Sequence, residues 1–254
     1  MAIPLRRSLA KLTLTILECE PLIKVYSHPR SGTHFLEKFI GLNFYSNINL
    51  ERKPIVWGHW SNRQVNKDGY DYQRLFGNHF FPSEHHNQKG KYIYIIRDPR
   101  AVAYSIWKTK NFLSAKDSNL SFSEFIRVKL DWVGSPACKT IPKWNIAQHW
   151  SHHVANWLRY SISGKNIMIV TYEDLKLYPE KVFSDILKKF FPMTFAKRKI
   201  ISPRIKVVKE KTGLLPNQAS IDAWKSVFTE EDELFLIRQI EHKFFLRDHL
   251  SYQF

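Results

Sequence analysis

The chain has 254 residues, a length that suits one α/β domain with a filled core. Its hydrophobic fraction of 44% and charged fraction of 24% are ordinary for a globular protein and exclude a disordered or fibrous chain. The formal net charge of +16 predicts an anionic partner, and composition leaves open a phosphate-rich cofactor, a nucleic acid or an acidic membrane surface.

The cysteines and the N-terminal segment bear on the compartment. The two cysteines, Cys19 and Cys138, lie far apart without ligand-like spacing, so they predict neither a zinc site nor a disulfide framework. Residues 1–20 are apolar but interrupted by charges, and we expect an amphipathic N-terminal helix there, not a signal or an anchor. No other stretch approaches the roughly 20 apolar residues of a membrane span. We therefore expect a cytoplasmic protein without stable membrane insertion.

The core is predicted to open with a strand, a turn and a helix. Residues 22–26 are apolar and β-branched, and a helical pattern begins after the turn that follows them. Residues 55–57 predict a second short strand. Residues 61–90 are polar and aromatic, which predicts a segment made mostly of loops that covers the entrance to an active site.

The same unit of strand, turn and helix recurs at residues 91–96, where the strand ends at Arg97 and Pro99 opens the next helix. The remaining predicted elements are a helix near 122–132, a helix at 146–160, a strand at 166–170, a helix at 179–190 and a helix at 230–245 with Thr229 as its N-cap. This alternation predicts one α/β domain over residues 1–254, with its core at 22–245. Its central, mostly parallel sheet carries helices on both faces.

An anion site is predicted at the first turn. A turn between a buried strand and a helix leaves backbone N–H groups unpaired at the helix start. Gly32 lets the backbone approach a phosphate, Ser31 and Thr33 add hydroxyl donors, and Arg30 adds a charged fork. A plain strand-to-helix connection capped by Ser or Thr would explain the same residues. No lysine follows Gly32 as in a Walker A loop, which disfavours an ordinary nucleotide kinase.

Two motifs carry a family resemblance. Pro29-Arg30-Ser31-Gly32-Thr33 resembles the 5′-phosphosulfate loop of sulfotransferases that use 3′-phosphoadenosine 5′-phosphosulfate (PAPS), with arginine where the cytosolic small-molecule members generally carry lysine. Arg97 and Ser105, eight residues apart, resemble the family's 3′-phosphate motif. The resemblance implies a P-loop NTPase-like sulfotransferase fold, PAPS as cosubstrate, 3′-phosphoadenosine 5′-phosphate (PAP) as product, and no metal.

The resemblance also implies roles for individual residues. Those implied to bind the cosubstrate are Arg30, Ser31, Gly32, Thr33, His34, Arg97, Ser105, Tyr172, Lys209, Lys211 and Gly213. Arg30 would also assist the transfer. Asp98 and Arg100 would shape the turn or pair with neighbours, although an Arg97–Asp98 ion pair is an alternative. The late loop departs from the family spacing, so a charged flexible loop remains an alternative for Lys209 and Lys211.

The acceptor must lose a proton during transfer, and a histidine contributes roughly 10²–10⁴-fold as a general base. We predict His59 in this role, because the resemblance implies a catalytic histidine after the strand between the two motifs. His79 is the main competitor, and His85 and His86 rank below it.

Two other functions stay open at this point. A P-loop-like nucleotide kinase shares the strand, loop and helix but would need Mg²⁺. A basic nucleic-acid-binding protein fits the charge, although lysines and arginines are spread along the whole chain without a recognised module. We expect no nucleic acid partner. The expected acceptor is a small molecule or a carbohydrate, and the expected state is a monomer or a homodimer.

Overall fold

The structure is a computed structural model. It describes residues 22–45, 75, 77, 79–82, 90–110, 112–132, 143–164, 166–191 and 220–254. The helix predicted at 1–20, the strand predicted at 55–57 and most of the loop predicted at 61–90 lie outside these ranges.

A parallel sheet forms the centre of the fold. Its described strands are β1 (Lys24–Ser27), β2 (Tyr92–Ile96) and β3 (Ile167–Thr171), in the order β1-β2-β3. Val25 pairs with Ile93, and Ile93 pairs in turn with Met168. The central strand β2 is apolar throughout and buried on both faces, as a parallel strand covered by helices should be. Three of the four predicted strands are thereby confirmed within two residues at each end.

Helices surround the sheet. The longer ones are α2 (Thr33–Ile40), α3 (Pro99–Thr109), α4 (Phe122–Arg127), α5 (Ile146–Ser163), α6 (Tyr172–Leu177), α7 (Pro179–Phe190), α9 (Glu230–Gln239) and α10 (Lys243–His249). The short turns are a π-helical turn η1 (Gly41–Tyr45) and the 3₁₀ turns η2 (Asp117–Asn119) and η4 (Ala223–Ser226). None of the helices in the described ranges combines the length and apolar character needed to cross a bilayer.

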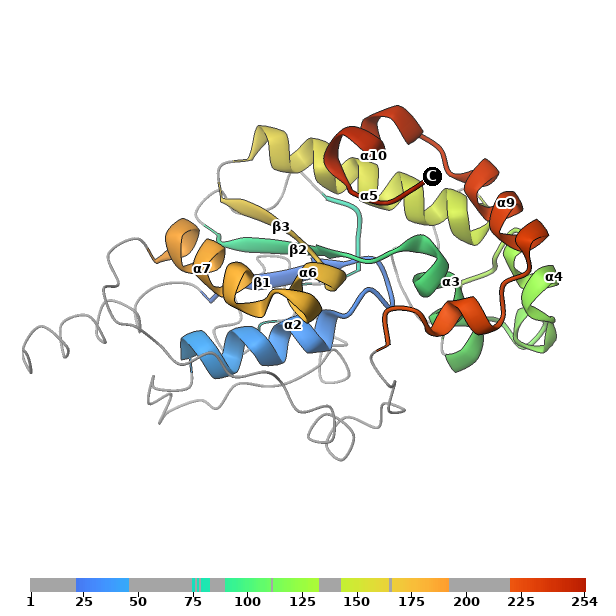
Figure 1. Ribbon diagram of the computed structural model, residues 1–254, viewed down its shortest axis with the longest axis horizontal. Helices are drawn as coiled ribbons and strands as arrows, with labels where there is room; N and C mark the ends of the chain where they lie inside the picture. The colour runs from blue at the N-terminus through green and yellow to red at the C-terminus, as the bar shows by residue number, and fades with distance from the viewer. Residues whose placement is uncertain are drawn as a thin grey trace, which may run out of the picture.

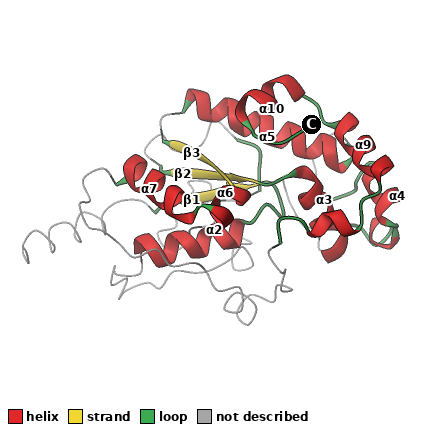
Figure 2. Ribbon diagram, viewed as in Figure 1, coloured by secondary structure: helices red, strands yellow, loops and turns green. Residues whose placement is uncertain are grey.

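Two apolar layers pack on opposite faces of the sheet. Alternate β2 side chains divide between them: Tyr94 joins the layer of α3, α4, α5, α9 and α10, whereas Ile93 and Ile95 join the layer of α2, α6 and α7. Figure 1 shows α5 and α10 on one side of the sheet and α2 on the other, and Figure 2 shows the three strands between these two groups of helices. The predicted parallel sheet with helices on both faces is therefore confirmed.

Two predicted helices are shorter than expected. The helix predicted at 230–245 is wrong as one element, because it breaks between α9 and α10, where His242 adopts a left-handed conformation with φ of 57°. The break lets Ile240 and Leu246 both reach the core, where they are 3% and 0% exposed. The helix predicted near 122–132 ends at Arg127, because the chain then extends and the Leu130 amide donates to the Trp144 carbonyl.

Candidate functional site

The turn after β1 has a left-handed backbone at two positions. Arg30 has φ of 67° and Gly32 has φ of 96°. A non-glycine residue in this region costs of order 1–3 kcal/mol, and such residues gather at functional sites. At Gly32 a side chain is also excluded by space, since an added Cβ would lie 2.4 Å from Cδ2 of the Tyr172 ring. The turn is thus shaped closely around Tyr172.

Donors without acceptors collect at this turn. Gly32 is the N-cap of α2 and has no side chain to accept from the first amides of the helix. The buried Ser31 hydroxyl has no hydrogen-bond partner within the described part of the chain. The Thr33 hydroxyl lies 2.6 Å from the Ser27 hydroxyl. The start of α2, the hydroxyls and the arginine therefore lie together at this turn, and such a group of donors is suited to an anion.

The second turn follows β2 and leads into α3. Asp98 caps this helix by accepting from the Arg100 amide at 2.8 Å, and Pro99 occupies its first turn as predicted. The Asp98 carboxylate pairs with Arg100 at 2.6 Å, and Arg100 also contacts Glu233 at 2.5 Å. The expectation that Asp98 and Arg100 pair with neighbours is confirmed. No Arg97–Asp98 ion pair occurs, because Arg100 takes the carboxylate.

The two turns meet at one place. Arg30 Nε donates to Ser105 Oγ at 3.1 Å, although the residues are 75 positions apart. Arg97 Nη1 donates to the Arg30 carbonyl at 3.4 Å. The Arg97 guanidinium also lies over the Tyr172 ring, 4.5 Å from its centroid. The crossover turns of β1 and β2 therefore place their side chains in a common site, and α6 supplies its aromatic floor.

Two arginines, Arg30 and Arg97, carry the positive charge of this site. Within the described ranges neither Arg30 nor Arg97 forms an ion pair with a carboxylate. Burial, together with the Arg97 charge, lowers the pKa of Arg30 to about 10, so Arg30 stays charged at neutral pH. Arg97 Nε is buried without a hydrogen-bond partner among the described residues. Two cations with unused donors are suited to a phosphate or sulfate group.

Histidine 79 lies beside the first turn. Its Nδ1 is 2.9 Å from the Ser27 carbonyl and 3.1 Å from the Ser27 hydroxyl, which in turn contacts Thr33. A carbonyl only accepts, so Nδ1 of His79 carries a proton in this contact. The main competitor for the role of base thus contacts Ser27, at the start of the first turn. His59 lies outside the described residues, as do His85 and His86.

A cluster of buried histidines beneath the turn was not predicted from the sequence. His28 Nε2 lies 2.8 Å from His149 Nδ1, and His153 Nδ1 lies 2.7 Å from the Tyr94 hydroxyl. Burial holds the pKa of His28 and His149 well below the ordinary value and lowers that of His153 to about 4. The three rings are therefore neutral at pH 7. The one feature of the sequence that could have indicated this cluster is the i, i+4 spacing of His149 and His153 on the apolar face of α5.

The structure does not place every predicted residue. His34 lies one residue into α2, and its Nδ1 contacts the Glu37 carboxylate at 2.8 Å. Lys209, Lys211 and Gly213 lie outside the described ranges, so their predicted closure over the site stays a prediction.

Comparisons with known proteins identify the family. The profile described as the sulfotransferase domain matches residues 21–204, more than half of the chain. The chain belongs to the sulfotransferase family. An amine sulfotransferase of Oryctolagus cuniculus is 25% identical over 178 residues, which cover 65% of this chain and 53% of the relative. A 3-alpha-hydroxysteroid sulfotransferase of Cavia porcellus is 24% identical over 235 residues, which cover 80% of this chain and 76% of the relative. The chain spans about half the length of the first of these relatives.

Solved structures agree on the fold of this sulfotransferase-family chain. A mouse sulfotransferase complexed with PAP covers 91% of the chain at a TM-score of 0.53, with 16% identity and 87% of its own chain covered. Retinol dehydratase in complex with androsterone and PAP also covers 91% of the chain, at a TM-score of 0.55, with 16% identity and 82% of its own chain covered. Both likenesses confirm the predicted sulfotransferase fold.

Proposed function

We propose that this chain transfers a sulfuryl group from PAPS to a hydroxyl or an amine of a small-molecule or carbohydrate acceptor. The observation that carries the proposal is the meeting of Arg30 with Ser105 and Arg97, from two turns that lie far apart in the sequence. PAPS has an anionic group at each end of its nucleoside, and two adjoining cationic turns suit such a ligand. The names of the relatives, an amine and a hydroxysteroid sulfotransferase, support a compact acceptor.

The residues present fit the cosubstrate. Ser31 Oγ and Arg97 Nε are buried donors without partners in the described ranges, as expected where a ligand supplies the acceptors. The residues proposed to bind the 5′-phosphosulfate end are Arg30, Ser31, Gly32, Thr33 and His34. We assign the 3′-phosphate to Arg97 and Ser105, and a wall of the nucleotide pocket to Tyr172. Lys209, Lys211 and Gly213 are proposed to close over it. When bound, PAPS supplies the sulfuryl group.

The proposed base is His59, with His79 as its competitor. His59 lies outside the described residues, whereas His79 Nδ1 lies 2.9 Å from the Ser27 carbonyl, beside the first turn. His59→Gln should lower kcat by roughly 10²–10⁴-fold while PAP still binds. Activity retained in His59→Gln and lost in His79→Gln would move the role to His79.

The test of the function begins with binding. PAP titrated into the protein in a calorimeter should bind, and Arg97→Ala should raise its Kd by about 10–100-fold, the effect of losing a hydrogen bond to a charged group. Arg159→Ala is the matched control, because Arg159 is exposed and pairs outside the site with His242. Equal affinity in Arg97→Ala and the control would refute the assigned site. Screening acceptors with labelled PAPS would then define the substrate.

The kinase alternative predicts a different response to metal. A phosphotransferase needs Mg²⁺ at the transferred group, whereas the proposed transfer relies on arginine and histidine side chains. Turnover of PAPS in excess chelator should therefore persist. Activity that requires both Mg²⁺ and ATP would favour the kinase.

We further propose that residues 22–245 unfold as one domain. The protein is proposed to be a monomer or a homodimer, and light scattering would distinguish these two states.

A further inference from the structure

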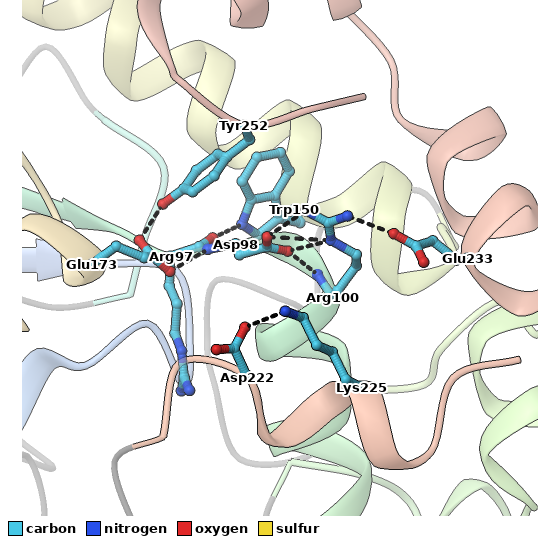
Figure 3. Close-up of polar contacts among 9 residues, drawn as sticks. All are labelled: Arg97, Asp98, Arg100, Trp150, Glu173, Asp222, Lys225, Glu233 and Tyr252. Carbon is cyan, nitrogen blue, oxygen red and sulfur yellow. Dashed lines mark hydrogen bonds and ion pairs between the residues drawn. The ribbon is translucent and has the colours of Figure 1, made fainter. Parts of the chain in front are cut away.

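The peptide unit between Arg97 and Asp98 is held at both edges. The buried Trp150 indole on α5 donates from Nε1 to the Arg97 carbonyl at 3.1 Å. The Glu173 carboxylate on α6 accepts from the Asp98 amide at 3.2 Å. This carbonyl and this amide belong to one planar peptide, so the two contacts fix its orientation on opposite sides (Figure 3).

Glu173 is itself held by a residue from the far end of the sequence. The Tyr252 hydroxyl donates to Glu173 Oε2 at 2.6 Å, across 79 positions. The Tyr252 ring also packs against the Trp150 ring, with centroids 6.4 Å apart. Figure 3 shows Tyr252 and Trp150 side by side above the Arg97–Asp98 turn. Burial, with the nearby Glu173 carboxylate, keeps the pKa of Tyr252 well above its ordinary value, so the hydroxyl remains a donor.

The orientation of this peptide matters because it sets the direction of the Arg97 side chain. The guanidinium is directed toward the Arg30 turn, where Nη1 donates to the Arg30 carbonyl, and Nη2 donates to the Ser220 carbonyl at 3.0 Å. Backbone carbonyls are weak partners for a guanidinium compared with a carboxylate. The geometry of the anion site therefore depends on how firmly the backbone of Arg97 is fixed.

We propose that Glu173 and Tyr252 are positioning residues that orient Arg97 toward the anionic ligand through the Asp98 amide. Neither side chain is assigned a contact with the ligand. The inference rests on the proposed function for the identity of that ligand, a nucleotide with a 3′-phosphate. Its chemical basis is a chain of two hydrogen bonds, from Tyr252 to Glu173 and from the Asp98 amide to Glu173, which ends at the residue after Arg97.

The test measures PAP affinity by calorimetry in folded protein, well below each variant's Tm. Tyr252→Phe removes the hydroxyl and keeps the ring against Trp150, and it should raise the Kd about tenfold, as for one lost hydrogen bond to a charged group. The KM for PAPS should rise in parallel while kcat stays within about twofold, because Tyr252 does not touch the transferred group. Tyr178→Phe is the matched control, since Tyr178 is 56% exposed. It should leave both constants unchanged.

A second arm asks whether the effect passes through Arg97. In an Arg97→Ala background, Tyr252→Phe should no longer change the Kd, because the side chain that it positions is absent. Glu173→Gln keeps a carbonyl oxygen for the Asp98 amide and should weaken binding less than Glu173→Leu. The inference would be overturned if the Kd of Tyr252→Phe for PAP lay within twofold of the wild-type value. It would also be overturned if Tyr252→Phe raised the Kd equally with and without Arg97. Failure of the wild-type protein to bind PAP would instead refute the proposed function, and the inference with it.

Discussion

Replacing Gly32 by alanine should destabilise the protein through two separable effects. The left-handed backbone at Gly32, with φ of 96°, costs an L-residue about 1–2 kcal/mol. The new Cβ would also lie 2.4 Å from Cδ2 and 2.9 Å from Cε2 of Tyr172. That ring is 3% exposed and lies under Arg97, so it has little room to move, and overpacking of this kind costs about 1–3 kcal/mol. The sum is about 2–5 kcal/mol.

A double-mutant cycle in urea at 25 °C separates these effects. Tyr172→Ala removes the ring, so Gly32→Ala in that background should cost only about 1–2 kcal/mol for the backbone strain. Gly164→Ala serves as the control, because Gly164 ends α5 at φ of −107° and its nearest neighbour would lie 3.1 Å from the new Cβ. It should change stability by less than about 1 kcal/mol. A Gly32→Ala cost below about 1 kcal/mol, or an identical cost in both backgrounds, would refute the reasoning.

Three further predictions concern stability. His153 has a pKa of about 4 in the folded protein against 6.5 in the unfolded chain, so the free energy of unfolding should fall by roughly 3 kcal/mol between pH 6.5 and pH 4. Urea midpoints at several pH values should show this fall in the wild type but not in His153→Gln, and a flat wild-type profile would contradict it. Ser121→Ala removes the capping box of α4 and should cost about 1 kcal/mol, whereas Ser118→Ala, at a half-buried serine that caps no helix, should cost less. Trp157→Phe leaves the Phe80 carbonyl without its indole donor and should cost about 1–3 kcal/mol in thermal unfolding, and an unchanged Tm would count against that contact.

Much of the layout was predictable because it follows local patterns. The apolar run before Arg97 and the proline after Asp98 predict a strand, a turn and a helix start, and the structure confirms each of them. The resemblance assigned the two phosphate motifs to one cosubstrate, and the 3.1 Å contact between Arg30 and Ser105 supports that assignment. Strand and turn patterns succeed because they depend on burial period and on the rigidity of proline.

The features that were missed all depend on contacts between distant segments. The hydrogen bond from Tyr252 to Glu173 joins positions 79 residues apart, so no local pattern links the two residues. The break at His242 contains no proline or glycine, so periodicity alone extended one helix across it. It forms because the residues on either side pack into the same core layer. Local propensity cannot anticipate such a tertiary constraint.

The register of the sheet also limits the order in which the chain can fold during synthesis. Val25 on β1 pairs with Ile93, and Ile93 pairs with Met168, so both strand pairings among the described residues span a long intervening segment. The middle strand can acquire its second neighbour only after the ribosome has released β3. Until then its apolar edge is open to aggregation, as is typical of slow, non-local pairings. Expression at low temperature, where synthesis and association both slow, should therefore favour the yield of native protein.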